Sequence, residues 1–168
     1  MYSFLYTRFS LYLTTIKIKN MNFKLLQPFI GVVIILLTIS CKVEPEAIEY
    51  GKDQCSFCMM NIVDKTHAAQ YVTKKGKQFK FDAIECLVND LSKKGEQDLA
   101  IILVADYGKP GDMIDAKTAT YIISSAIKSP MGANLSGVKS LEKALELQQQ
   151  YLGDIYAWEP LKKHLSNN

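Results

Sequence analysis

The sulfur-rich segment Asp53–Met60 is the part of this chain best suited to chemistry. It reads Asp-Gln-Cys-Ser-Phe-Cys-Met-Met, so Cys55, Cys58 and Met60 place two thiols and a thioether close together. Thiolates and thioethers are soft ligands, which select Cu(I) over hard cations such as Mg²⁺. A Cys-x-x-Cys pair can also form a redox disulfide. The segment therefore predicts either a soft metal site or a redox site.

The spacing of Cys58 and Met60 adds a geometric expectation. In an extended strand, residues i and i+2 point to the same face, so both sulfurs could bind one ion from one side. A third ligand must then come from elsewhere in the fold. A structural zinc site would need four nitrogen or sulfur ligands, and only Cys86, His67 and His164 are available to complete one. We therefore prefer Cu(I) to zinc.

The N-terminal segment has the pattern of a signal peptide. Lys24 precedes an apolar run, residues 29–39, which ends at Ser40-Cys41. The run is too short to span a bilayer comfortably, because a transmembrane helix needs about 20 residues. We expect cleavage before Cys41, which would then carry a lipid. The alternative is an ordinary secreted protein with a free Cys41.

Residues 21–40 alone make a complete signal peptide, so Met21 is the expected start. The charge balance changes if residues 1–40 are removed. Their removal takes away four of the 20 basic residues and none of the 17 acidic ones, so the remainder is slightly acidic. No Lys/Arg run that could bind nucleic-acid phosphates remains. We expect a protein on the periplasmic side or the cell surface, anchored by its lipid to the inner or outer membrane.

Three cysteines remain if Cys41 is acylated, and three thiols cannot form a closed disulfide framework. Residues 41–52 are polar and acidic, and are predicted to be a flexible tether. Cys86 lies near the edge of an apolar helix face, so we interpret it as a buried inert thiol. His67 is interpreted as a strand residue with a hydrogen-bond partner.

The rest of the chain is predicted to contain one structural pattern twice. In each copy two short strands are followed by a helix and a further strand. The helix of the first copy begins at Asp82–Glu85, which fits a capping box. In the second copy Leu141, Ala144, Leu145 and Leu152 share one helix face. The predicted strands are 67–73, 78–81, 99–104, 119–124, 133–139 and 155–158.

These elements predict an α+β fold of two tandem ββαβ units. The first unit is expected at residues 53–107 and the second at 119–168, joined by a linker at 108–118. Neither unit could bury enough apolar surface alone, so the two should pack against each other.

Three segments together resemble the NosL family of lipoprotein accessory factors of nitrous oxide reductase. Cys55–Asp64 matches the family's C-x-x-C-x-M signature, Phe81–Cys86 matches its F-D-x-x-x-C segment, and Ser129–Asn134 contains its P-M-G segment. The resemblance covers nearly the whole chain after residue 41. It implies two related ββαβ units and a Cu(I)-binding role.

The resemblance also implies the ligands and the partners. Carried over by position, the metal ligands would be Cys58, Met60 and Met131, with Cys55 as a further member of the motif. Met59 stands where many members have a glycine, which leaves open which methionine faces the metal. The implied partners are nitrous oxide reductase and its membrane maturation complex.

The resulting hypothesis is a membrane-anchored Cu(I) metallochaperone that is not an enzyme. The alternative is a periplasmic thiol–disulfide oxidoreductase that uses Cys55 and Cys58, and a third interpretation is a module that only binds a partner. The sequence leaves open a homodimer and the participation of Met59, His67 or Cys86 in binding.

Overall fold

The computed structural model describes residues 43–166. The predicted signal peptide and the lipidation site Cys41 lie outside these residues and stay predictions. Within the described range, no helix has both the length and the apolar composition that a membrane span requires.

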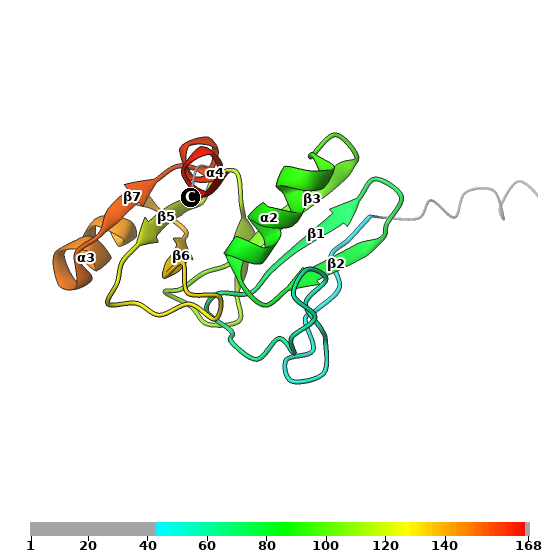
Figure 1. Ribbon diagram of the computed structural model, residues 1–168, viewed down its shortest axis with the longest axis horizontal. Helices are drawn as coiled ribbons and strands as arrows, with labels where there is room; N and C mark the ends of the chain where they lie inside the picture. The colour runs from blue at the N-terminus through cyan, green and yellow to red at the C-terminus, as the bar shows by residue number, and fades with distance from the viewer. Residues whose placement is uncertain (1–42, 167–168) are drawn as a thin grey trace, which may run out of the picture. The chain divides into compact units, whose positions relative to one another are not determined.

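The first half of the fold consists of one helix and a four-stranded antiparallel sheet (Figure 1). The strand order is β2-β1-β3-β4, so β1 lies between β2 and β3. In chain order the elements are β1 (Ala69–Thr73), β2 (Gln78–Phe81), α2 (Ile84–Lys94), β3 (Leu99–Ala105) and β4 (Met113–Asp115).

The second half repeats this order with a three-stranded sheet, β6-β5-β7. Here again the first strand is central and antiparallel to both neighbours. The predicted α+β class and the repeated ββαβ order are therefore confirmed. The elements are β5 (Thr120–Ile123), β6 (Leu135–Val138), α3 (Leu141–Tyr151), β7 (Asp154–Tyr156) and α4 (Trp158–Ser166).

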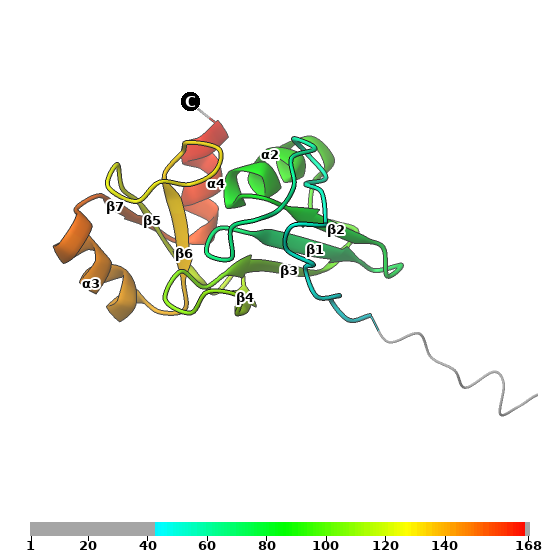
Figure 2. The same cartoon turned by 90° about the horizontal axis from the view of Figure 1, so that it is seen from below.

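The two halves share one hydrophobic core, as the sequence predicted. Tyr71, Phe81 and Leu87 of the first half belong to the same buried cluster as Tyr121 and Trp158 of the second. Figure 2 shows α4 beside α2, on the same side of the two sheets. This shared core holds the first turn of α2 close to strand β6, where a Cβ added at Gly137 would meet the end of the Ile84 side chain.

Two short elements differ from the sequence prediction. Strand β4 lies inside the predicted linker, 108–118, and extends the first sheet. The last predicted strand, 155–158, is shorter than expected because Trp158 begins α4. Pro160 fits in the first turn of that helix, where the missing N–H of proline has no intrahelical partner to lose.

The predicted apolar face of α3 is wrong. Ala144 and Leu147 are buried, whereas Leu141, Leu145 and Leu152 are exposed. The small second sheet can cover only a narrow stripe of the helix, so the face centred on Ala144 and Leu147 is the one that packs.

The capping box predicted at the start of α2 is also wrong. The N-cap is Ala83, and no side chain bonds to the free N–H groups there. Asp82 precedes the cap, and the Glu85 carboxylate bonds to the second half of the fold instead.

The segment before the motif is held against β2. Residues 43–49 have no regular secondary structure. The side chains of Gln78 and Lys80 nevertheless donate hydrogen bonds to the carbonyls of Glu44 (3.0 Å) and Ala47 (2.8 Å). These contacts lead the chain directly to the Cys-x-x-Cys segment.

Candidate metal centre

Residues 53–64 form a closed loop, here called the motif loop. An antiparallel bridge pairs Gln54 with Asn61, and the Cys55 N–H donates to the Met60 carbonyl at 2.8 Å. The Ser56 N–H donates to the carbonyl of Lys80 on β2, also at 2.8 Å. The loop is therefore fixed both internally and against the first sheet.

The expectation that Cys58 and Met60 point to the same face assumed an extended strand. The backbone of the motif loop is not extended. Cys58 lies in a turn, and Met59 has a φ of 65° in the left-handed region. Glycine adopts this conformation without strain, whereas a methionine does not. The turn instead directs the Cys58 N–H toward the sulfur of Cys55, at 3.5 Å.

The sulfur atoms of Cys55, Cys58 and Cys86 all lie within 4.8 Å of one another. Cys55 and Cys86 are buried, and Cys58 is half-buried at the edge of the cluster. Cys86 stands in the first turn of α2, so the cluster joins the motif loop to this helix. Among residues 43–166, no histidine or carboxylate completes the group.

The sulfur of Cys55 is surrounded by hydrogen-bond donors. A hydrogen bond from the Cys86 thiol is the largest influence and lowers the pKa of Cys55, while burial opposes it. The N–H groups of Cys58, Asp82 and Phe57 lower it further. Donors that point at a sulfur favour its charged form, so Cys55 is held as a thiolate, the form that binds metals.

The other two thiols are held as donors. The pKa of Cys86 is raised, first because its thiol bonds to Cys55 and then because it is buried. Burial is also the largest cause that raises the pKa of Cys58. One negative charge is therefore shared by three sulfur atoms, which suits a cation that can displace the two remaining protons.

Two of the sequence-predicted ligands, Met60 and Met131, are exposed. Met60 follows Cys58 in the motif loop and is 52% exposed, and Met131 is 42% exposed. Met131 belongs to the loop between β5 and β6, which bends toward the first turn of α2 (Figures 1 and 2). The Glu85 carboxylate accepts hydrogen bonds from Ser129 and from the Ala133 N–H, so this loop is bonded to the residue next to Cys86.

His67 takes part in a different set of contacts. Its Nδ1 lies 2.7 Å from a carboxylate oxygen of Asp64, and its Nε2 lies 3.1 Å from the Ser136 hydroxyl on β6. The partner expected for His67 is present, although the residue precedes β1 instead of belonging to it. Both ring nitrogens are engaged, and the contacts link the end of the motif loop to the second half.

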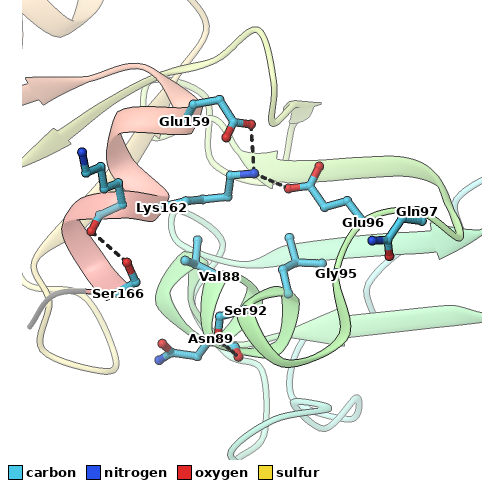
Figure 3. Close-up of a pocket in the computed structure, with 11 residues that line it drawn as sticks. Val88, Asn89, Ser92, Gly95, Glu96, Gln97, Glu159, Lys162 and Ser166 are labelled. Carbon is cyan, nitrogen blue, oxygen red and sulfur yellow. Dashed lines mark hydrogen bonds and ion pairs between the residues drawn. The ribbon is translucent and has the colours of Figure 1, made fainter.

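An open pocket of about 740 Å³ lies elsewhere, between α2 and α4 (Figure 3). None of its lining residues is a cysteine or a methionine. The ammonium group of Lys162 at its edge is already paired with Glu96 at 2.6 Å and Glu159 at 2.9 Å. The pocket therefore offers no sulfur ligand and is not part of the thiol cluster.

The fold and the cluster define a small two-sheet α+β protein with a three-thiol site. The NosL family model matches residues 47–166, and the chain belongs to the NosL family. A solved structure, the copper chaperone NosL from Shewanella denitrificans, matches with a TM-score of 0.62 and 20% sequence identity. The match covers 70% of this chain and 95% of that one, and at this identity it establishes the fold. A search among curated proteins gives no significant match.

Cys86 is the member of the cluster that was interpreted as inert from the sequence. It is buried as expected, but its sulfur contacts Cys55. One signal could have found it: if the chain is exported, as the sequence predicts, three free thiols are a liability unless they share a role. The same thiol is the cysteine of the F-D-x-x-x-C segment.

Proposed function

We propose that this protein is a Cu(I)-binding metallochaperone, anchored to a membrane by a lipid on Cys41, that delivers copper for assembly of the copper centres of nitrous oxide reductase. The observation that supports it most is the group of three sulfur atoms within 4.8 Å. Membership in the NosL family and the fold shared with a copper chaperone agree with this role.

The chemistry of the cluster favours Cu(I) over other ions. Cu(I) is soft and accepts two or three sulfur ligands, whereas a structural zinc site needs four. The described thiols offer three sulfurs and no oxygen ligand. A hard cation would find no matching donor there.

The position of the cluster favours a carrier over an enzyme. Cys55 and Cys86 are buried, but Cys58 and the neighbouring Met60 reach the surface. A bound ion could therefore be exchanged through the exposed sulfur ligands with a partner that offers soft ligands of its own. No substrate has to enter the protein for such an exchange.

Anchoring and delivery complete the proposal. Cys41 stands only fourteen positions before the first motif cysteine, so a lipid there would hold the site near the membrane surface. The lipid would keep the carrier beside a membrane-bound maturation complex. Loss of copper from nitrous oxide reductase in cells that lack this chain would support delivery, and an unchanged copper content would contradict it.

An anaerobic titration tests the binding step. The full chain in detergent, carrying Cys41→Ser, is titrated with Cu(I) against a competing chelator. We expect about one equivalent to bind, and Cys58→Ser in the same background to weaken binding strongly. Met113→Leu is the matched control for a sulfur outside the motif and should bind like the parent. An absence of binding, or binding that ignores Cys58→Ser, would overturn the proposal.

A thiol–disulfide oxidoreductase remains the second candidate. The lowered pKa of Cys55 favours it, because a thiolate is the nucleophile in disulfide exchange. However, the Cys-x-x-Cys pair lies in a loop that leads to β1, not at the start of a helix. Met60→Ala separates the two functions: reduction of a disulfide substrate would be unaffected, whereas Cu(I) affinity should fall.

A further inference from the structure

The Glu85 carboxylate connects the two halves of the fold at the thiol cluster. Glu85 is on α2 in the first half, and its side chain is 5% exposed. One carboxylate oxygen, Oε1, accepts hydrogen bonds from the Ser129 hydroxyl and from the Ala133 N–H, the latter at 3.2 Å. Both donors belong to the loop of residues 129–134 in the second half.

These two hydrogen bonds lie on either side of Met131. The Ser129 hydroxyl also accepts a hydrogen bond from the Asn134 N–H at 2.9 Å, and the Gly132 N–H donates to the Ser129 carbonyl at 3.1 Å. The loop is thus closed on itself and fixed to Glu85. Hydrogen bonds on both sides of Met131 therefore connect its loop to Glu85 in the first turn of α2.

Glu85 is the residue that precedes Cys86 in this turn. The sulfur of Cys86 in turn lies within 4.8 Å of those of Cys55 and Cys58. One short path of neighbouring residues therefore leads from the Met131 loop to the three sulfur atoms. No other contact between the halves includes a neighbour of a cluster cysteine among the hydrogen bonds of residues 43–166.

Holding the loop with the buried Glu85 carboxylate costs free energy. Its second oxygen, Oε2, is buried and has no hydrogen-bond partner. Burying a carboxylate oxygen without a hydrogen-bond partner is unfavourable. An apolar contact would hold the two halves together at a lower cost in free energy. This cost indicates that the loop must be held in one defined position against α2, which apolar packing alone would not specify.

We propose that Glu85 is a positioning residue that holds Met131 as a soft ligand for Cu(I) bound at the thiol cluster. The inference rests on the proposed function. Glu85 itself does not touch the ion. Its carboxylate fixes the loop of the second half so that the Met131 thioether is presented to sulfurs of the first half, which makes the complete site a product of both halves.

A double-mutant cycle between Glu85 and Met131 tests the proposal. The full chain in detergent with Cys41→Ser is the parent, and Cu(I) affinity is measured against a chelator. We expect Glu85→Ala and Met131→Leu each to weaken binding, by roughly tenfold, as is typical of coupled neighbours. The double variant should bind no more weakly than Met131→Leu alone.

Two further variants keep the test decisive. Glu85→Gln retains the accepting oxygen and should bind Cu(I) within about twofold of the parent. Ser129→Ala removes the hydroxyl that donates to Glu85 and accepts from the Asn134 N–H, and it supplies the same cycle if Glu85→Ala does not fold. Ser136→Ala is the control: it removes a different bond between the halves, so its melting temperature should fall while Cu(I) affinity stays the same.

The outcomes separate this inference from the proposed function. If Glu85→Ala weakens binding equally with and without Met131, the carboxylate acts on the thiols or on the fold, and the positioning role is overturned. In that case strong Cu(I) binding that depends on Cys58 still supports the metallochaperone. A parent chain that fails to bind Cu(I) overturns both.

Discussion

The sulfur of Cys86, on the first turn of α2, lies within 4.8 Å of the sulfur of Cys55 in the motif loop. This contact joins two segments that are distant in sequence. A metal ion bound there would replace protons at sulfur atoms contributed by both segments.

Cu(I) affinity should rise with pH. The pKa values of Cys58 and Cys86 are raised, so both thiols are protonated at neutral pH and must lose a proton to bind as thiolates. Below these pKa values, each released proton strengthens apparent binding about tenfold per pH unit. Cys55 adds little to this slope because its pKa is lowered. Competition titrations at about pH 6, 7 and 8 measure the slope.

The control for this prediction is Cys58→Ser, which removes one titrating thiol. Its pH slope should be shallower than that of the parent by up to about one decade per unit. If the Cu(I) affinity of the parent chain did not change with pH, Cys58 and Cys86 would not bind the ion as thiolates.

Met59→Gly should stabilise the fold. Met59 has a φ of 65° and is 65% exposed, so glycine removes backbone strain and loses little packing. We expect a gain of roughly 0.5–1 kcal/mol, after the extra chain entropy of glycine is subtracted. Leu152→Gly, with a φ of 58° and 75% exposure, should behave in the same way. Urea unfolding checks both, and a loss of stability in both would refute the strain argument.

Unfolding free energy should decrease as the pH falls below the ordinary aspartate range. Burial alone would raise the pKa of Asp64, but hydrogen bonds from Thr66 and His67 outweigh it and lower the pKa below 3.8. A carboxylate with a lowered folded-state pKa contributes stability above its unfolded pKa and loses it as the pH falls through the folded value. Asp64→Asn should therefore flatten the acid limb of stability against pH, measured by urea unfolding.

The Asp64 assignment fails if Asp64→Asn gives the parent's profile of unfolding free energy against pH.

Leu147→Ala should destabilise the protein far more than Leu145→Ala. Leu147 is 7% exposed in the small apolar cluster between α3 and the second sheet, whereas Leu145 is 43% exposed on the opposite side of α3. We expect a loss of about 2–3 kcal/mol for the buried leucine and under about 0.5 kcal/mol for the exposed one. Thermal unfolding of the two variants compares them directly. A larger loss for Leu145→Ala than for Leu147→Ala would mean that α3 packs with the face predicted from sequence.

The sequence predicted the order of elements well because most of them depend on local patterns. The β1–β2 hairpin follows from the turn at Lys74–Lys77, and α2 follows from apolar residues at helical spacing. The elements that were missed or shortened depend on distant contacts. β4 pairs with β3 across the predicted linker, and α4 is stabilised by burying Trp158 and Leu161 in the shared core.

The candidate site shows the same division. The motif cysteines were recognised from their spacing, but the membership of Cys86 depends on how α2 packs against the motif loop. Glu85 was interpreted as a helix cap, which is its usual local role at this position. Its actual partners, Ser129 and Ala133, come from the other half of the fold. No local sequence pattern predicts these contacts.

X-ray absorption at the copper edge tests the central claim most directly, namely that sulfur atoms of the motif loop and of α2 bind one Cu(I) together. The full chain with Cys41→Ser is loaded anaerobically with one equivalent of Cu(I). We expect a coordination shell made of sulfur alone, which loses a sulfur in Cys58→Ser and again in Cys86→Ser. A shell of nitrogen or oxygen ligands, or one that neither substitution changes, would contradict the account.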